Sequence, residues 1–106
     1  MTTELRQREP RLEIPKLRAY ANGQECTVRH PAHCIGIGVV AAHYNWQDGG
    51  KGKGLKCHDT HIAFACIGCH VFLDDAASAS VEERKLWWLR GHLRTLYILV
   101  RDKVLQ

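Results

Sequence analysis

The alternation of apolar and polar residues predicts a small α+β domain that ends in a long helix. Two short apolar runs, residues 39–44 and 59–65, have the length and pattern of strands. The segment between them carries glycines at 49, 50, 52 and 54, a density that costs too much backbone entropy for regular structure. A short helix is expected to begin at His70. The predicted order is therefore strand, long loop, strand and helix.

The C-terminal helix, over 80–106, is the clearest predicted element. Ser80 is a good N-cap, and Glu83 three residues later completes a capping box. Aliphatic residues then recur at helical spacing and form one apolar stripe: Leu86, Leu89, Leu93, Leu96, Val100 and Val104. We expect this stripe to pack into the core, with a homodimer contact through the helix as the alternative.

The N-terminal residues 1–19 are interpreted as a basic, irregular arm. They carry several arginines and two prolines, Pro10 and Pro15, and a short helical turn is expected at 16–21. A strand-like piece is expected at 25–29. At 106 residues the chain is expected to form one domain, with the arm followed by a core over 20–79 and the helix over 80–106.

Composition narrows the class of protein. With 45% hydrophobic and 25% charged residues the chain is ordinary for a globular protein. The apolar runs are far shorter than the roughly 20 residues that span a bilayer, and residues 1–8 lack the apolar core of a secretion signal. We therefore expect a cytoplasmic protein without a membrane partner. A net charge of +4 favours a polyanionic partner.

Cysteine usage indicates a metal site. Five cysteines in a cytoplasmic chain argue for metal binding or catalysis rather than for disulfides. Cys66 and Cys69 have the spacing of a zinc knuckle, and Cys26 with Cys34 could complete a structural Zn²⁺ site of four thiolates. Two buried free thiols at 26 and 34 are the simpler alternative. Cys57 is the odd cysteine; paired with His58 or His61 it offers an alternative zinc pair.

A second, different metal site is expected beside the cysteines. On a helix, His70 and Asp74 stand at i and i+4 and project from one face, with Cβ atoms about 5–6 Å apart. Such a pair leaves positions open on Mg²⁺ or another divalent cation, which could neutralise charge on a scissile phosphate. His43, where the first apolar run ends, is suited to accept a proton near neutral pH, and we expect it to converge with His70 over the same open cation.

The lysines of the glycine-rich segment, Lys51, Lys53 and Lys56, are candidates for DNA contacts. The segment does not match the nucleotide-binding pattern G-x-x-x-x-G-K-[ST], because Leu55 stands where the lysine is needed. A flexible, lysine-rich loop beside a catalytic strand is suited to follow a phosphate backbone. A solvated hairpin loop is the alternative.

Several short motifs together resemble the HNH, or ββα-metal (His-Me finger), endonucleases, and most closely the small YbcO-like nucleases of phages and prophages. They cover roughly residues 18–75 and comprise Glu25-Cys26-Thr27-Val28-Arg29, Cys34-Ile35-Gly36, Ala42-His43, Gly52-Lys53-Gly54, Asp59 and Cys66-x-x-Cys69-His70 with Leu73-Asp74. The resemblance implies a zinc-stapled ββα-metal domain and a metal-dependent DNA endonuclease in the bacterial host cell.

The same resemblance implies roles for individual residues. His43 is expected to be the general base, Cys26, Cys34, Cys66 and Cys69 the structural zinc ligands, and His70 with Asp74 the ligands of the catalytic metal. Asp59 is taken as the substitute for the middle Asn of the motif, with His61 or Asn45 as alternatives. Two rival functions remain: a non-catalytic, zinc-stabilised nucleic-acid-binding module, and a zinc protein whose long helix docks another chain.

Overall fold

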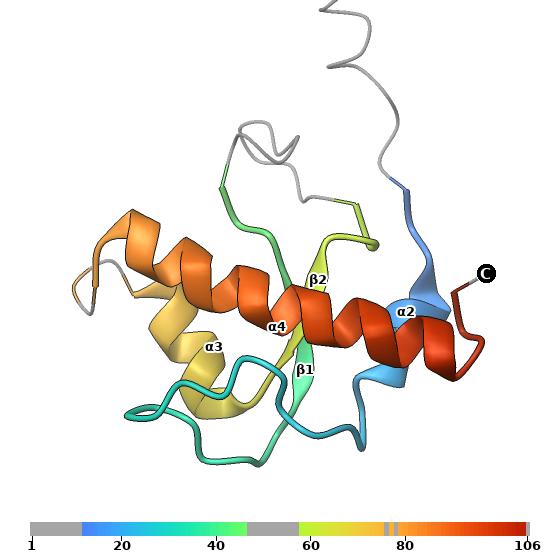
Figure 1. Ribbon diagram of the computed structural model, residues 1–106, viewed down its shortest axis with the longest axis horizontal. Coiled ribbons are helices and arrows are strands. Elements are labelled where there is room, and N and C mark those ends of the chain that lie inside the picture. The colour runs from blue at the N-terminus through green and yellow to red at the C-terminus, as the bar shows by residue number, and fades with distance from the viewer. Residues whose placement is uncertain (1–11, 47–57, 76, 78, 106) are drawn as a thin grey trace, which may run out of the picture.

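The computed structural model describes residues 12–46, 58–75, 77 and 79–105. These ranges form a small α+β domain with a two-stranded sheet and a long C-terminal helix (Figure 1). The elements in chain order are α2 (Pro15–Tyr20), β1 (Val40–His43), β2 (Ile62–Ala65), α3 (Ile67–Asp74) and α4 (Val81–Arg101). The predicted order of strand, loop, strand and helix is therefore confirmed, as is the short helix near residue 16.

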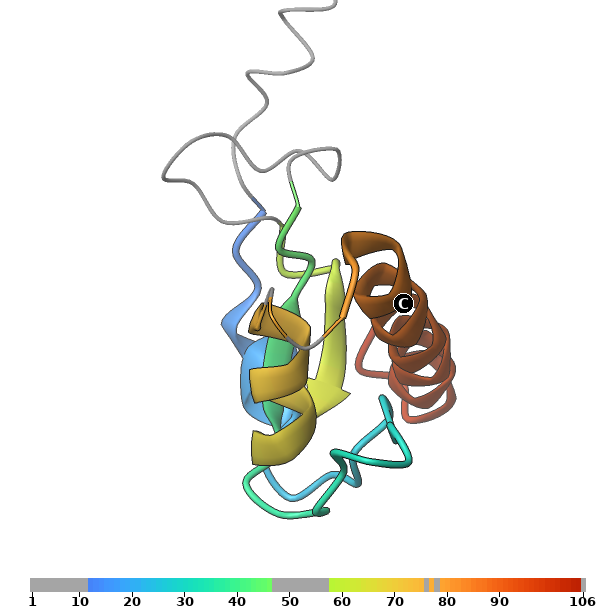
Figure 2. The same ribbon diagram turned by 90° about the vertical axis from the view of Figure 1, so that its left-hand side faces the viewer.

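The two strands form an antiparallel hairpin with a helix on each face. Val40 pairs with Ala65 and His43 with Ile62. Ala42 and Ala63 pack into a cluster with α3, whereas Ile62 and Phe64 pack with α2 on the other face. Figure 1 shows this arrangement, with α3 and α2 on either side of the strands and α4 running across them; Figure 2 gives the perpendicular view.

Helix α4 lies along the outer edge of β2 and supplies hydrogen bonds to the strands. The Phe64 N–H donates to the Thr95 hydroxyl at 3.1 Å, and the Thr27 N–H donates to the Phe64 carbonyl at 2.7 Å. The Trp88 indole donates to the Ala42 carbonyl at 3.0 Å. Gly91 permits this approach, since a Cβ there would lie 2.8 Å from the Val28 side chain. The backbone of Thr27 and two side chains of α4 thus make hydrogen bonds that a third strand would otherwise make.

The prediction for the inward face of α4 was wrong. Its buried residues are Arg84, Trp88, Gly91, Thr95 and Leu99, whereas Leu86, Leu89, Leu93 and Val100 are 46–59% exposed. The edge of a sheet presents unpaired N–H and C=O groups, so the helix that covers it needs polar and small side chains there. The N-terminus of the helix is as predicted, because the Ser80 hydroxyl accepts from the Glu83 N–H.

Other boundaries differ from the sequence-based expectation. Residues 25–29 form no strand, and Asp59 lies in a turn before β2 rather than in it. Helix α3 begins at Ile67, three residues before His70, because Cys66 is its N-cap. Residues 1–11 of the basic arm lie outside the described residues. None of the described helices is both long enough and apolar enough to cross a membrane.

Candidate metal centre and histidine sites

Four cysteines from three parts of the chain converge on one point. The sulfur atoms of Cys26, Cys34, Cys66 and Cys69 all lie within 4.8 Å of one another. The Cys34 and Cys66 sulfurs are 3.8 Å apart. Tetrahedral zinc with Zn–S bonds of about 2.3 Å requires a sulfur–sulfur separation of about 3.8 Å. The cluster could therefore hold a metal such as zinc with little rearrangement.

Backbone N–H groups around Cys66 lower the pKa of its thiol. Burial raises the pKa of this thiol, but backbone N–H groups of Cys69, Gly36 and Ile35 outweigh burial and lower the pKa to about 6. Two of these donors lie 3.4 Å (Cys69) and 3.3 Å (Ile35) from the sulfur. The thiolate, which is the metal-binding form, is thus favoured at Cys66.

The neighbouring thiols show the opposite shift. Burial raises the pKa of Cys69, and it also raises the pKa of Cys34, with Cys26 and Cys66 as further causes in both cases. Negative charges this close together disfavour one another, and a divalent cation among them removes that penalty. The four sulfur atoms could therefore hold a divalent cation, which would favour their thiolate forms.

Gly68, inside the Cys-x-x-Cys segment, is required by the way the cluster is assembled. A Cβ at this position would lie 1.9 Å from the carbonyl oxygen of His33. The loop that carries Cys34 thus packs directly on the first turn of α3, which explains how cysteines more than thirty residues apart meet.

His43 and Asp59 form the second candidate site, on the α2 side of the hairpin. The His43 Nε2 atom lies 2.8 Å from Asp59 Oδ1, and the Asp59 side chain is fully buried. Its other oxygen, Oδ2, accepts from the Ile14 N–H at 2.5 Å and lies 3.1 Å from Arg18 Nε. The sequence analysis named both residues as site candidates without predicting their contact, and it missed Arg18 and Ile14, which contact the carboxylate.

His70 and Asp74 share the outer face of α3, as the i, i+4 spacing predicts. His70 Nδ1 lies 3.8 Å from Asp74 Oδ2, and the two side chains are 41% and 48% exposed. The Asn45 side chain donates to Asp74 at 3.3 Å, which ties α3 to the residue two places after His43. In the described part of the chain the four cysteines form the one group of three or more candidate ligands, so no third ligand joins this pair.

The structure does not gather the two histidine pairs into one centre. His43 lies on the same face of β1 as Ala41, which packs on the α2 side, whereas α3 packs on the side of Ala42. The two imidazoles therefore come from opposite faces of the hairpin. Lys51, Lys53, Lys56 and Cys57 lie outside the described residues, so their predicted roles have no structural counterpart here.

Comparison with protein families places the chain. A family model described as "Putative nuclease YbcO" matches residues 15–104, which is most of the sequence. The chain belongs to the YbcO family. A nuclease function, which is hydrolytic chemistry on nucleic acid, fits this membership. The matched range holds every cysteine of the cluster and both histidine pairs.

A solved structure also resembles the chain. It is described as a "putative bacteriophage protein from Escherichia coli str. K-12 substr. MG1655", shares 28% sequence identity and superimposes with a TM-score of 0.66. The match covers 83% of this chain and 100% of that one. No curated protein matches the chain. The expected likeness to YbcO-like phage proteins is thus confirmed, and the HNH subtype remains a prediction.

Proposed function

We propose that the protein is a metal-dependent DNA endonuclease of the HNH, or ββα-metal, type, in which His43 is the general base. YbcO family membership supports nuclease activity, and the order β1, β2, α3 agrees with a ββα arrangement. The observation that carries the proposal is the hydrogen bond between His43 and the fully buried Asp59.

This hydrogen bond fixes the state of the imidazole. Oδ2 of Asp59 accepts from Ile14 and faces Arg18, so the carboxylate is ionised and Oδ1 is an acceptor. His43 therefore carries its proton on Nε2 and leaves a lone pair on Nδ1. The His43 side chain is 19% exposed, so water reaches it. Nδ1 can then take a proton from a water that attacks the phosphodiester, and the buried carboxylate stabilises the resulting imidazolium.

The remaining groups have proposed roles. His70 and Asp74 would hold a divalent cation such as Mg²⁺, which when bound would neutralise charge on a phosphate of the bound DNA. Because they lie on the other face of the hairpin from His43, their role is tested separately from that of the base. Cys26, Cys34, Cys66 and Cys69 would hold a structural Zn²⁺, since four thiolates leave no open position on the ion. Lys51, Lys53 and Lys56 would contact DNA phosphates.

Nicking of supercoiled plasmid tests the proposal. The purified protein with Mg²⁺ or Mn²⁺ should nick the plasmid, and His43→Ala should lower the rate by about 10²-fold or more. Arg90→Ala, a change on an exposed face of α4, goes through the same purification and controls for contaminating nucleases. His70→Ala, assayed over a range of Mg²⁺ concentrations, should raise the concentration needed. Nicking that is unchanged in His43→Ala removes His43 from the mechanism.

A non-catalytic nucleic-acid-binding module is the alternative, and one observation favours it. Asp59 joins His43, Arg18 and the Ile14 backbone, so the same contacts could serve only to fasten the N-terminal segment to the hairpin. This alternative predicts salt-sensitive DNA binding with no cleavage products under any divalent cation. The plasmid assay and a binding assay on the same protein therefore separate the two functions.

A homodimer through α4 is also proposed, together with a location in the cytoplasm of a bacterial host. Leu86 and Leu89 are 47% and 46% exposed in the first half of the helix. Two such helices packed side by side would remove these leucines from water. Sedimentation velocity should show a dimer at high protein concentration, and Leu86→Glu with Leu89→Glu should return it to a monomer.

A further inference from the structure

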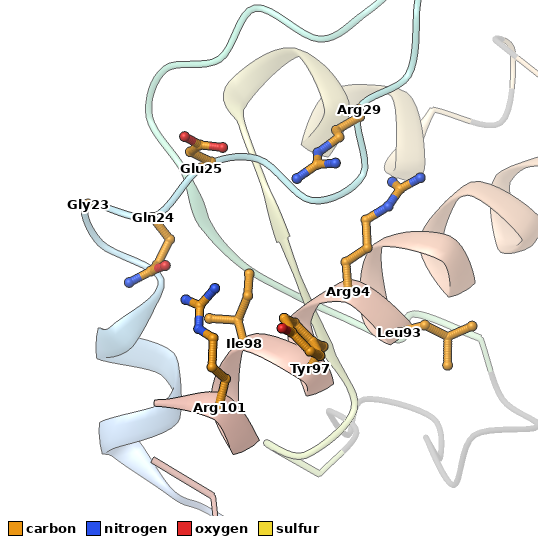
Figure 3. Close-up of a pocket in the computed structure, with 9 residues that line it drawn as sticks. All are labelled: Gly23, Gln24, Glu25, Arg29, Leu93, Arg94, Tyr97, Ile98 and Arg101. Carbon is orange, nitrogen blue, oxygen red and sulfur yellow. The ribbon is translucent and has the colours of Figure 1, made fainter. Parts of the chain in front are cut away.

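A cavity beside the second half of α4 contains none of the residues of the two histidine pairs. It has a volume of about 700 Å³ and lies between the second half of α4 and the segment 23–29 (Figure 3). Three arginines, Arg29, Arg94 and Arg101, line it together with Tyr97 and Glu25. None of these residues has a role in the proposed reaction.

Two of the arginines have no ion-pair partner among the described residues, although the Glu25 carboxylate lines the same cavity. Arg29 Nε donates to the Cys26 carbonyl at 3.1 Å, and Arg94 Nη1 donates to the Thr27 carbonyl at 2.6 Å. Figure 3 shows the two side chains approaching each other, Arg29 from the upper wall and Arg94 from α4 below. Among the described residues neither forms an ion pair, whereas Arg101 is paired with Asp102 at 2.7 Å. Two guanidinium groups held by neutral carbonyls make a preorganised site for an anion.

The backbone at Arg29 is strained in a way that serves this site. Its φ angle is 57°, a left-handed conformation that is uncommon for residues other than glycine. Strained backbone persists where the surrounding structure enforces it, and such positions cluster at functional sites. Here the conformation allows the arginine to reach back to the Cys26 carbonyl and to stand beside Arg94.

The lower wall of the cavity offers an aromatic surface. Tyr97 is 67% exposed and Leu93 is 58% exposed, so both present apolar area to solvent on the same face of α4. Arg101 lies over the Tyr97 ring at 5.7 Å. An exposed ring next to cationic groups is the combination with which proteins hold single-stranded nucleic acid, because unpaired bases stack on it while phosphates are neutralised.

We propose that this cavity binds one nucleotide unit of an unpaired DNA strand, with the phosphodiester between Arg29 and Arg94 and the base on Tyr97. The proposal rests on the proposed nuclease function and specifies its substrate as DNA with a single-stranded segment. A duplex would present phosphates to the arginines but no free base to Tyr97, so it would use only half of the site.

Fluorescence anisotropy of labelled DNA tests the proposal. His43→Ala protein is titrated, without added Mg²⁺, into a twelve-residue thymidine strand and into a hairpin duplex of equal charge. In the His43→Ala protein, the second substitution Tyr97→Ala should weaken binding of the single strand about tenfold and leave duplex binding within twofold. Tyr97→Phe in the same protein should keep the affinity for the single strand. Unchanged single-strand binding in Tyr97→Ala, or an equal loss for the duplex, overturns the proposal.

Variants of Arg29 test the phosphate contact. Arg29→Gly retains the backbone conformation and should reduce the salt dependence of single-strand binding by about 0.7 in the log–log slope, while Arg29→Lys should largely retain it. Arg90→Ala, on the same helix outside the cavity, is the matched control and should leave the slope unchanged. Metal content and thermal unfolding are measured for each variant. A folded, metal-loaded Arg29→Gly protein with the original slope overturns the phosphate assignment.

Competition with a free nucleotide tests whether the site takes a DNA strand or a mononucleotide, and plasmid nicking by the same variants tests whether the cavity and nuclease proposals fail separately. Thymidine monophosphate should compete at least tenfold more weakly than the strand, and equal competition would mean that the site takes a free nucleotide. If the plasmid is never nicked but Tyr97→Ala still lowers single-strand affinity, the nuclease proposal fails and the cavity stands. If nicking depends on His43 while both cavity variants bind as before, the cavity proposal fails alone.

Discussion

The cysteine cluster and the His43–Asp59 pair are both built from residues far apart in sequence, but they are assembled differently. The cysteines meet through close backbone packing, with Gly68 against the His33 carbonyl and N–H groups aimed at sulfur. The histidine pair depends on the Arg18 side chain of α2 and on the backbone N–H of Ile14, the residue before α2. The Cys-x-x-Cys spacing in the sequence indicates the cysteine cluster, whereas no spacing in the sequence indicates the contact between His43 and Asp59.

The largest expected effect is loss of folding when the cysteine cluster, rather than the His43–Asp59 pair, is changed. Cys69→Ser should lower metal content from near one zinc per chain and abolish cooperative unfolding, because structural zinc contributes on the order of 10 kcal/mol to folding. Zinc analysis and thermal unfolding measure this. Cys57→Ser is the control and should change neither. Stoichiometric zinc in a Cys66→Ser, Cys69→Ser double variant would show that the ligands are wrong.

The next effect concerns the His43 site and should appear in activity rather than in metal content. The Ile14 N–H donates to Asp59 Oδ2 and the Arg18 guanidinium forms an ion pair with the same oxygen, so in Asp59→Asn the amide oxygen must face them. The amide NH₂ then faces His43, which reverses the tautomer and places the proton on Nδ1. Nicking should fall by at least about 10²-fold, or roughly 3 kcal/mol.

Asp74→Asn is the matched control for this change. It removes the same charge from the pair of His70 and Asp74, where no buried acceptor fixes the histidine tautomer. Asp74→Asn should therefore raise the Mg²⁺ concentration that nicking requires. Equal nicking by Asp59→Asn and by the unmodified protein would remove the dyad from the mechanism.

A smaller effect probes the close packing that builds the cluster. Gly68→Ala places a methyl group on the His33 carbonyl oxygen, so the loop carrying Cys34 must move. Stability should fall by about 2 kcal/mol and zinc affinity should fall with it. Urea denaturation and competition with a chelator measure the two losses. Val71→Ala, at an exposed position of the same helix, should have almost no effect. Because alanine is the better helix former at both positions, a loss at Gly68 cannot come from helix propensity, and an equal loss at Val71 would show that the contact with His33 is not its cause.

The smallest effect is expected away from both sites. Thr95→Val removes the hydroxyl that accepts from Phe64, but the Thr27 hydroxyl still accepts from the same N–H at 3.0 Å. The cost should therefore be about 1 kcal/mol, and Thr95→Ser should recover most of it. Neither variant should change zinc content or nicking per folded molecule.

The sequence predicted the elements better than it predicted how they pack. Helix α4 was expected from its cap and period, yet Leu86, Leu89 and Leu93 are exposed, whereas Arg84 and Thr95 are buried. Periodicity locates an apolar face but does not reveal that the neighbouring edge of β2 needs hydrogen-bond partners. Arg18 likewise gave no signal, because its pairing with Asp59 joins residues 41 positions apart. An arginine on a short helix within a basic segment is otherwise unremarkable.

The strand edge closed by hydroxyl groups has a consequence for how the family can vary. Helix α4 contacts both strands from outside the hairpin, through Thr95 to Phe64 in β2 and through Trp88 to Ala42 in β1. Residues inserted after Trp46 and before His58 would therefore leave the register unchanged. A relative could carry a different connection there while retaining the same scaffold and the contact between His43 and Asp59.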